Sequence, residues 1–337
     1  MSSRQRKLFA LLLGIAPVVA MAAGPVVDRC TPTMATLKLD SPASVERITV
    51  DVYLPGDYTR SARKRYPVLY ANDGQDMQAV ELVPTLAELC RKHAIREPIV
   101  VAVHMLRDRA SGYGLSNRAT HRSLVGGSKI GPIGSRAYDY SRWFARQLVP
   151  YIDAHYRTER SARARSVLGW SLGALNAFNL GWEYPRVFGR VGAFSPSFWL
   201  AADRDSDKAA QRTRLAQRMV DSGPKRNGLR FWFAAGTAEE TNDRDHDGVI
   251  DVIDDLDDLV NGYRAPDGFR ERGLRQLGYT VNMDDAAHPR TAADVSVYLL
   301  PQGQHKQATW AKMLPPFLRW DYGTRAMRGA RASLAPD

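Results

Sequence analysis

Short apolar runs alternate with segments of helical periodicity along most of the chain. Residues 46–54 alternate apolar and polar side chains, which is typical of a half-buried strand. Residues 66–71 and 98–103 are almost continuous apolar runs, and they predict strands buried on both faces of a parallel sheet. Further strands are expected over 166–168, 190–194, 229–234 and 294–300.

Helices are expected between these strands, over 80–95, 138–156 and 172–182. The alternation predicts an α/β fold with a mostly parallel central sheet and helices on both faces. No repeat or low-complexity linker divides the chain, so we expect a single domain. The stretch 241–289 is too long for a simple connection and is expected to be an acidic insertion after a late strand.

The N-terminus has the three parts of a secretory signal peptide. Arg4, Arg6 and Lys7 precede an apolar stretch, 8–20, and small residues follow at 20–23. We therefore expect residues 1–23 to be removed and the mature domain, 24–337, to be periplasmic or secreted. The densest apolar part is too short to span a bilayer, so no stable membrane insertion is expected after cleavage.

The composition excludes several classes of protein. Of the 337 residues, 44% are hydrophobic and 25% charged, which is ample for a core and excludes a disordered chain. The net charge of +11 falls to +8 without the leader, and its basic residues are scattered, so no nucleic-acid partner is predicted.

The two cysteines are too few for a disulfide scaffold or a four-thiolate zinc site. In an oxidising compartment Cys30 and Cys90 can form a disulfide that ties the mature N-terminus to a helix. The alternative, in which Cys90 is a small buried hydrophobic residue, stays open.

A nucleophile elbow is the strongest catalytic signal. Gly169-Trp-Ser171-Leu-Gly173 matches G-x-S-x-G, and it lies between an expected strand and an expected helix. The two glycines let the backbone pass closely, and the hydroxyl of Ser171 is then held out at the edge of the sheet. Ser171 is the predicted nucleophile.

A serine nucleophile needs a base and an acid later in the chain. His305 follows the strand expected over 294–300, as the base of this kind of triad should, whereas His288 lies in a polar segment with no strand before it. The carboxylate should follow the strand expected over 229–234, which makes Glu239 the first choice and Glu240 the reserve.

Two backbone N–H groups should stabilise the oxyanion. One is expected from Leu172, directly after the nucleophile, and the other from the loop 72–76 that follows an early strand. Within that loop Gln75 is the first choice and Asp76 the next. Trp170 and Trp199 are candidates to line a substrate pocket, with burial in the core as the alternative for each.

The motifs together resemble a known family. YPVLYANDGQD (66–76), the GWSLG elbow, AFSPSFW (193–199), GTAEE (236–240) and the late GQH (303–305) are similar to the putative-esterase family of α/β-hydrolases. The family includes feruloyl and acetyl carbohydrate esterases, siderophore esterases and esterase D-type enzymes, as well as mycolyltransferases. The resemblance implies an α/β-hydrolase fold, with Ser171, His305 and Glu239 as the triad.

An acidic loop follows the expected triad acid and has the spacing of an EF-type calcium loop. Carboxylates fall at positions 1, 3, 5, 9 and 12, glycine at position 6 and a backbone carbonyl at position 7. We expect a structural Ca²⁺ ion here and no organic cofactor, with a solvated acidic surface as the alternative. The expected ligands are Asp243, Asp245, Asp247, Val249, Asp251 and Asp254.

These features predict an exported serine esterase that cleaves small-molecule or carbohydrate esters through an acyl-enzyme. Two alternatives stay open. One is an acyltransferase that uses the same triad, and the other is a non-catalytic, calcium-stabilised binding protein on a hydrolase fold.

Overall fold

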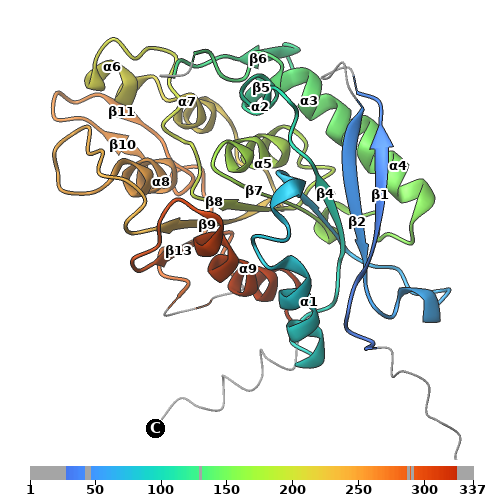
Figure 1. The fold of residues 1–337 in the computed structure, drawn as a ribbon. Coiled ribbons are helices and arrows are strands. Elements are labelled where there is room, and N and C mark those ends of the chain that lie inside the picture. Colours follow the sequence, from blue (N-terminus) through green and yellow to red (C-terminus); the bar gives the residue numbers. More distant parts are fainter. Residues whose placement is uncertain (1–27, 42–46, 129–130, 287–288, 290–291, 325–337) are drawn as a thin grey trace, which may run out of the picture.

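A nine-stranded sheet runs through the centre of the molecule (Figure 1). The computed structural model describes residues 28–41, 47–128, 131–286, 289 and 292–324. The strands of this sheet are Thr33–Leu39 (β1), Ile48–Leu54 (β2), Val68–Ala71 (β3), Ile99–Val103 (β4), Arg165–Trp170 (β7), Arg190–Phe194 (β8), Arg230–Gly236 (β9), Val281–Asn282 (β12) and Val295–Leu300 (β13). Their order across the sheet is β1-β2-β4-β3-β7-β8-β9-β13-β12.

The sheet is parallel except at one side. All neighbours from β4 to β12 pair in parallel, whereas β2 pairs antiparallel with both β4 and β1. The expected mostly parallel sheet is therefore confirmed. The carboxyl ends of its parallel strands meet at one edge, where ligand sites of open α/β sheets lie.

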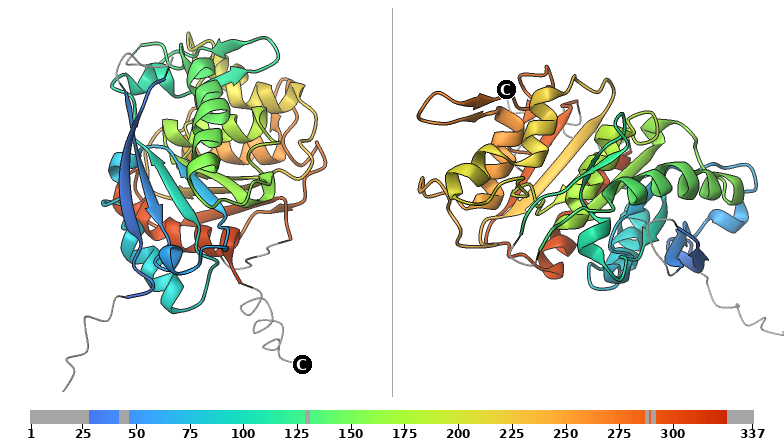
Figure 2. Two further views of the ribbon diagram at one scale, coloured as in Figure 1. Left: turned by 90° about the vertical axis from the view of Figure 1, so that its right-hand side faces the viewer. Right: turned by 90° about the horizontal axis from the view of Figure 1, so that it is seen from above.

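Helices cover both faces of the sheet. Figure 1 shows α1 and α9 on one face and α3 and α5 on the other, and Figure 2 shows the same layers from two further sides. The helices are Leu82–Arg91 (α1), Arg109–Gly112 (α2), Ala137–Trp143 (α3), Val149–His155 (α4), Leu172–Glu183 (α5), Asp207–Arg212 (α6), Leu215–Ser222 (α7), Asp251–Asn261 (α8) and Gln307–Tyr322 (α9), and the short helices are Tyr58–Arg60 (η1), Gly74–Asp76 (η2), Phe144–Leu148 (η3) and Ala162–Ala164 (η4).

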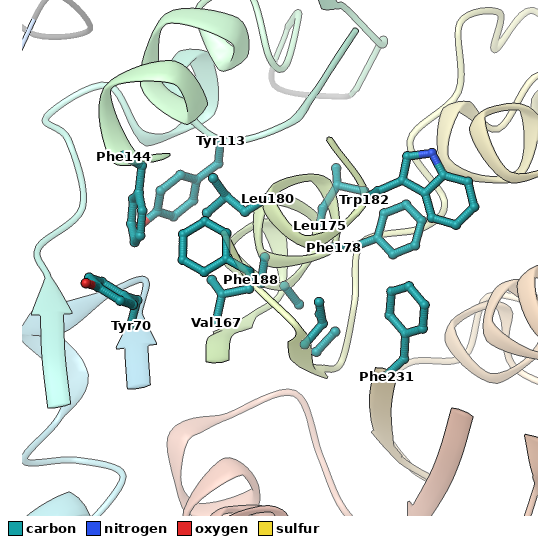
Figure 3. Close-up of a cluster of buried hydrophobic side chains, with 14 of the residues drawn as sticks. Tyr70, Tyr113, Phe144, Val167, Leu175, Phe178, Leu180, Trp182, Phe188 and Phe231 are labelled. Atoms are coloured by element: carbon teal, nitrogen blue, oxygen red, sulfur yellow. The ribbon is translucent and has the colours of Figure 1, made fainter. Parts of the chain in front are cut away.

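Helix α5 lies at the centre of the larger apolar core. Every residue from Leu172 to Trp182 is buried, including Asn176 and Asn179, whose side-chain amides donate to Ser141 Oγ at 3.2 and 2.9 Å. Figure 3 shows Phe178 and Trp182 of this helix packed among aromatic side chains from the sheet and from other helices. The rings of Phe178 and Phe231 of β9 lie 5.8 Å apart. This packing fixes α5, and with it the elbow at its start.

The helix expected over 138–156 is one continuous run of α3, η3 and α4. It contains a single π-helical turn at Phe144–Leu148. The other expected strands and helices agree with the structure to within a few residues at their ends.

Strand β1 was not expected from the sequence. It is an edge strand with mostly exposed residues, so burial does not impose a clear apolar pattern on it. Two small antiparallel pairs were also missed, namely β5 (Leu115–Asn117) with β6 (Arg122–Leu124) and β10 (Tyr263–Arg264) with β11 (Arg270–Glu271).

Strand β2 is buried almost throughout, so the expectation of a half-buried strand was wrong. Its alternating polar residue Asp51 lies between β1 and the end of β4. The carboxylate accepts a 2.6 Å hydrogen bond from Thr36 Oγ1 and pairs with His104 Nε2 at 2.7 Å. These partners satisfy the buried carboxylate, and they allow a polar residue to face the interior.

The expected acidic insertion, 241–289, folds as α8, the β10–β11 hairpin and β12. Buried Arg214 binds α8 through Asp255 at 2.6 Å and Asp258 at 2.5 Å. Strand β12 then joins the edge of the main sheet beside β13. The last part of this stretch is thus a component of the central sheet.

The two cysteines are joined in the structure. Cys30 and Cys90 form a disulfide with their Cα atoms 5.4 Å apart, and Asp28 also pairs with Arg91 of α1 at 3.0 Å. The N-terminal part of the described chain is therefore fastened to α1. The expected signal peptide, 1–23, lies outside the described residues. Within the described part of the chain, no helix has both the length and the apolar character needed to cross a bilayer.

Candidate active site

Ser171 lies at a sharp turn between β7 and α5. Its backbone has φ 56° and ψ −127°, a conformation that costs free energy in a residue with a Cβ atom. Both flanking glycines are required by close approaches. A Cβ atom on Gly169 would lie 2.2 Å from the carbonyl oxygen of Gly173, and one on Gly173 would lie 2.5 Å from Asp73 Oδ2. The elbow predicted from the sequence is therefore present.

His305 and Glu239 are brought together from loops far apart in the sequence. His305 Nδ1 lies 2.9 Å from Glu239 Oε2. The Glu239 side chain is 1% exposed and that of His305 is 42% exposed, so a buried carboxylate orients a ring that solvent can reach. Such a contact favours the tautomer with hydrogen on Nδ1, which leaves the lone pair of Nε2 free to accept a proton.

The loops that carry these two residues touch at two glycines. A Cβ atom on Gly236 would lie 2.3 Å from the carbonyl oxygen of Gly303. The N–H of Ala238 also donates to that carbonyl at 2.9 Å. The left-handed residue of the later loop is Gln302, with φ 58°. Gly303 is therefore needed for the close packing of the two loops.

The second oxygen of Glu239 is held by groups that the sequence reasoning missed. Ser195 Oγ donates to Glu239 Oε1 at 2.6 Å, as does the N–H of Gly236 at 2.6 Å. Trp310 Nε1 in turn donates to Ser195 Oγ at 2.8 Å. Ser195 has φ 47° and is buried, which marks it as a constrained position. A serine before a proline, directly after a strand of the site, was the available signal.

A stacked pair of tryptophans lies between His305 and the elbow. The rings of Trp310 and Trp170 lie 5.4 Å apart at an interplanar angle of 16°, and the ring of His305 meets Trp310 edge-on at 5.4 Å. Trp170 is the residue before Ser171. His305 and the elbow therefore lie close to each other, at the edge where the parallel strands of the sheet end.

Trp170 itself is 1% exposed, and its Nε1 donates to Asp76 Oδ2 at 3.0 Å. A ring buried in this way cannot line an open substrate pocket. Its expected role in substrate binding is thus corrected to a structural one, which was the alternative considered for it.

Glu240 points away from the base. Its Oε1 accepts from the N–H of Val252 at 2.9 Å and its Oε2 from Asn242 Nδ2 at 2.6 Å. Burial raises the pKa of its carboxyl above the ordinary value. Of the two glutamates considered from the sequence, Glu239 is the one in contact with His305.

The loop that carries Gln75 is locked against the elbow. Arg109 binds both carboxylate oxygens of Asp73, at 2.8 and 2.9 Å, and also donates to the carbonyl of Trp170 at 3.3 Å. Asn72 Nδ2 donates to the carbonyl of Gly173 at 2.9 Å. The salt bridge and the amide thus hold the 72–76 loop on the first turn of α5.

One expected oxyanion donor lies in the 72–76 loop, and the other lies in the first turn of α5. Gln75 belongs to the short helix η2, and its side chain accepts from the N–H of Met105 at 3.0 Å. Leu172 is the first residue of α5, where backbone N–H groups have no intrahelical acceptor. The helix N-terminus also carries partial positive charge.

Trp199 lines a cavity of about 310 Å³ beside the acid loop. Its ring is half-buried and lies 5.5 Å from the Arg204 guanidinium. The remaining lining residues are Ser128, Glu240, Asn242, Arg244 and Asp251. The cavity therefore lies where the Glu240 carboxylate points, and none of Ser171, His305 and Glu239 lines it.

Three of the expected calcium ligands lie together. Carboxylate oxygens of Asp243, Asp245 and Asp247 are within 4.8 Å of one another. Asp243 also accepts from the N–H of Asp247 at 3.2 Å and from that of Gly248 at 3.0 Å. Gly248 has φ 91°, which glycine adopts at low cost. Hard oxygen donors in a tight turn suit a hard cation.

The other two carboxylates of the expected set have protein partners. Asp251 Oδ1 accepts from the N–H of Arg244 at 2.9 Å, and its Oδ2 lies 3.4 Å from the guanidinium of the same arginine. Asp254 accepts a 3.4 Å hydrogen bond from Gln211 Nε2. Burial, aided by the nearby charge of Asp258, raises the pKa of Asp254 to about 7. Val249 lies in the turn between the two groups.

Comparison with known proteins now decides the family. A match to the family described as "Putative esterase" covers residues 41–320. The chain belongs to this family. Family membership confirms the resemblance and the fold class expected from the sequence.

Among curated proteins, the chain is 30% identical over 154 residues to the uncharacterized protein YjcH of Bacillus subtilis (strain 168), a match that covers 45% of this chain and 56% of that protein. The chain thus spans about half the length of the curated relatives it matches.

Among solved structures, the enterobactin esterase of Shigella flexneri has a TM-score of 0.60 at 17% identity, covering 88% of this chain and 61% of that one. The ferulic acid esterase of the anaerobic fungus Anaeromyces mucronatus has a TM-score of 0.54 at 15% identity, covering 90% of this chain and 95% of that one. At these identities the two likenesses show the shared fold.

Proposed function

We propose that this esterase-family protein hydrolyses carboxylic esters through a triad of Ser171, His305 and Glu239. The observation that carries the proposal is the 2.9 Å contact between His305 Nδ1 and buried Glu239, on the same side of the sheet as the strained elbow. A serine hydroxyl is a weak nucleophile unless an adjacent base accepts its proton, and the carboxylate orients that base.

In the proposed reaction Nε2 of His305 takes the proton of Ser171 Oγ as the oxygen attacks the ester carbonyl. The new C–O bond turns the carbonyl oxygen into an oxyanion, which accepts hydrogen bonds from the N–H groups of Leu172 and Gln75. His305 then returns the proton to the leaving alcohol, and the acyl group stays on Ser171. Water, deprotonated by the same imidazole, attacks the acyl-enzyme and releases the acid.

The substrate is proposed to be an ester of a small molecule or a carbohydrate. Ferulic acid and enterobactin esterases among the structural neighbours support this class. Trp199 stays a proposed contact for the substrate, because its half-buried ring lines a cavity.

We also propose a structural Ca²⁺ ion in the acidic loop. Asp243, Asp245 and Asp247 would supply carboxylates, and Val249 would supply its carbonyl oxygen. Full use of the predicted set requires Asp251 and Asp254 to turn from their present partners. The ion would neutralise an acidic segment that begins shortly after Glu239, and would thereby steady the acid loop.

The protein is further proposed to act after export, in the periplasm or outside the cell. Support comes from the signal-like N-terminus and from the Cys30–Cys90 disulfide, since structural disulfides persist in oxidising compartments.

The decisive experiment measures hydrolysis of aryl esters, acetylated and feruloylated sugars and siderophore esters by the wild-type protein and by Ser171→Ala. Wild-type activity that the variant lacks, together with fluorophosphonate labelling of Ser171, is the expected result. Product analysis with an added alcohol separates hydrolysis from acyl transfer. No turnover on the whole panel and no labelling of Ser171 would favour a non-catalytic binding protein.

A further inference from the structure

A second cavity, of about 420 Å³, lies away from the esterase site and is lined mainly by cationic and aromatic side chains. It is formed by the turn of the β5–β6 hairpin, one side of the α3–η3 helix and the segment just after α5 (Figure 1). Its lining residues are Arg118, His121, Tyr138, Arg142, Arg146 and Tyr184.

The cavity is remote from Ser171 because the two sites lie at opposite ends of one helix. Ser171 precedes the first residue of α5 and Tyr184 follows its last. A helix of twelve residues is about 18 Å long at 1.5 Å per residue. A ligand in the cavity therefore cannot contact the nucleophile unless it is extended.

The arginines of α3–η3 are not paired with an acid among the residues that the structure describes. Tyr138, Arg142 and Arg146 are spaced four residues apart and so share one side of the helix. Within the part of the chain that the structure describes, neither Arg142 nor Arg146 forms an ion pair with a carboxylate. Two exposed guanidinium groups thus face the same space, and their mutual repulsion is relieved by an anion.

Arg118 is held in place from the opposite side. Its Nε donates to the carbonyl of Glu183 at 2.8 Å, and its guanidinium lies 5.9 Å from the ring centre of Tyr184. The Glu183 carboxylate accepts from the N–H of Arg118 at 2.6 Å and lies 3.9 Å from Arg226. The Glu183 carboxylate is therefore already engaged, and it is not part of the cavity lining.

A histidine and two tyrosines complete the lining. His121 has φ 58°, and its ring stacks on Tyr138 at 5.5 Å. Burial raises the pKa of Tyr184 to about 12, so its phenol remains a hydrogen-bond donor at neutral pH. Guanidinium forks with nearby hydroxyl and ring N–H groups match the several acceptor oxygens of a tetrahedral oxyanion.

We propose that this cavity binds a phosphoryl or sulfuryl oxyanion, through Arg142 and Arg146 on one side and Arg118 on the other. The aromatic lining leaves room for a ring attached to the anion. The bound group is then either a free inorganic ion or the phosphate of a phosphorylated sugar. Only the phosphorylated sugar would also contact His121 and Tyr138.

Isothermal titration of the folded, full-length mature protein with inorganic phosphate, glucose 6-phosphate and glucose tests the proposal at low and at high salt. Saturable binding of at least one anion and none of glucose is expected, weakening as salt rises. A tighter complex with glucose 6-phosphate than with phosphate identifies the ring-bearing source, and equal affinities identify the free ion.

The test variant is Arg142→Gln/Arg146→Gln, and its control is Arg60→Gln/Arg63→Gln, which removes the same charge from exposed arginines elsewhere. We expect at least a ~10-fold loss of affinity in the first and less than ~2-fold in the second. Arg142→Lys/Arg146→Lys should be intermediate, because lysine keeps the charge but not the fork. Equal losses in the glutamine pair and in its control, or no saturable binding by the wild type, would overturn the proposal. Neither result depends on esterase activity.

Discussion

Ser195 Oγ donates a 2.6 Å hydrogen bond to Glu239 Oε1, while the other oxygen of that carboxylate lies 2.9 Å from His305. The buried acid is therefore fixed from both sides. Trp310 completes the arrangement, because its indole N–H donates to the same serine hydroxyl. The hydroxyl can satisfy both groups only with its own hydrogen directed at Glu239, so the carboxylate is held in one rotamer.

Ser195→Ala should lower kcat by about 10- to 100-fold, because a hydrogen bond to a charged group contributes about 1.5–3 kcal/mol. Ser195→Gly is the matched variant, since it also removes the hydroxyl but relieves the cost of φ 47°. We expect both to lose activity and to shift the acid limb of the pH–rate profile, while fluorophosphonate still labels Ser171. If Ser195→Gly is as active as the wild type, the hydroxyl does not position the acid.

Glu239→Gln and Glu240→Gln should differ sharply. The first removes the charge that faces His305 Nδ1, and a change of this kind costs a serine triad roughly 10³- to 10⁴-fold in kcat. The second changes a side chain that contacts Val252 and Asn242, so its kcat should stay within about 3-fold of the wild type. Steady-state kinetics on one aryl ester compare the two, and the reverse ranking would move the triad acid to Glu240.

The elbow could be predicted because it depends on local rules. A glycine on each side of Ser171 and a strand before a helix are visible in the sequence. Ser195 could not be assigned in the same way, since its role depends on a hydrogen bond to a residue 44 positions later and on an indole 115 positions later. Trp170 could not be placed for the same reason, because only Trp310 and Asp76 decide that its ring is buried.

Most of the sheet was also predictable, because strands buried on both faces form continuous apolar runs. Strand β1 was not predictable, because a strand exposed at the edge of the sheet needs no regular pattern of apolar residues. In β2 the pairing of Asp51 with His104 and Thr36 permits a buried polar residue, which the alternation alone could not reveal.

Loss of the disulfide should lower stability and leave the chemistry intact. Cys30 and Cys90 are 60 residues apart, and closing a loop of this size stabilises a fold by about 2–4 kcal/mol through the unfolded state. Cys30→Ser/Cys90→Ser should therefore have a lower urea midpoint and an unchanged kcat. Treatment with a reductant should shift the wild type by the same amount and the double variant not at all. A reductant effect on both proteins would point to another cause.

Removal of calcium should lower the melting temperature. An ion that binds only the folded state stabilises it by about 2.7 kcal/mol at one hundred times its Kd. We expect a chelator to lower Tm and added Ca²⁺ to restore it, whereas Mg²⁺ restores little because it demands a stricter octahedral geometry. Asp243→Asn/Asp245→Asn should be insensitive to both treatments, with Asp203→Asn/Asp205→Asn as an exposed control. A wild-type Tm that ignores the chelator would count against the site.

Glu271 should make the fold less stable as the pH rises. Its side chain is buried, its Oε2 has no hydrogen-bond partner within the described part of the chain, and the nearest cation, Arg218, is 4.0 Å away. Burial raises its pKa from the usual 4.5 to about 7. The folded state therefore binds this proton more tightly than the unfolded state does. The resulting stabilisation is complete below pH 4.5 and is lost as the pH rises through about 7.

Glu271→Gln removes this titration and keeps the shape of the side chain. The variant should melt above the wild type at pH 8 and close to it at pH 4.5, with the difference developing between these values. Asp205→Asn is a suitable control, because Asp205 is exposed and is not among the charges that act on Glu271. Thermal melts of the three proteins across this range measure the effect. A Glu271→Gln curve parallel to that of the wild type would mean that the pKa of Glu271 is the same in the folded and unfolded states.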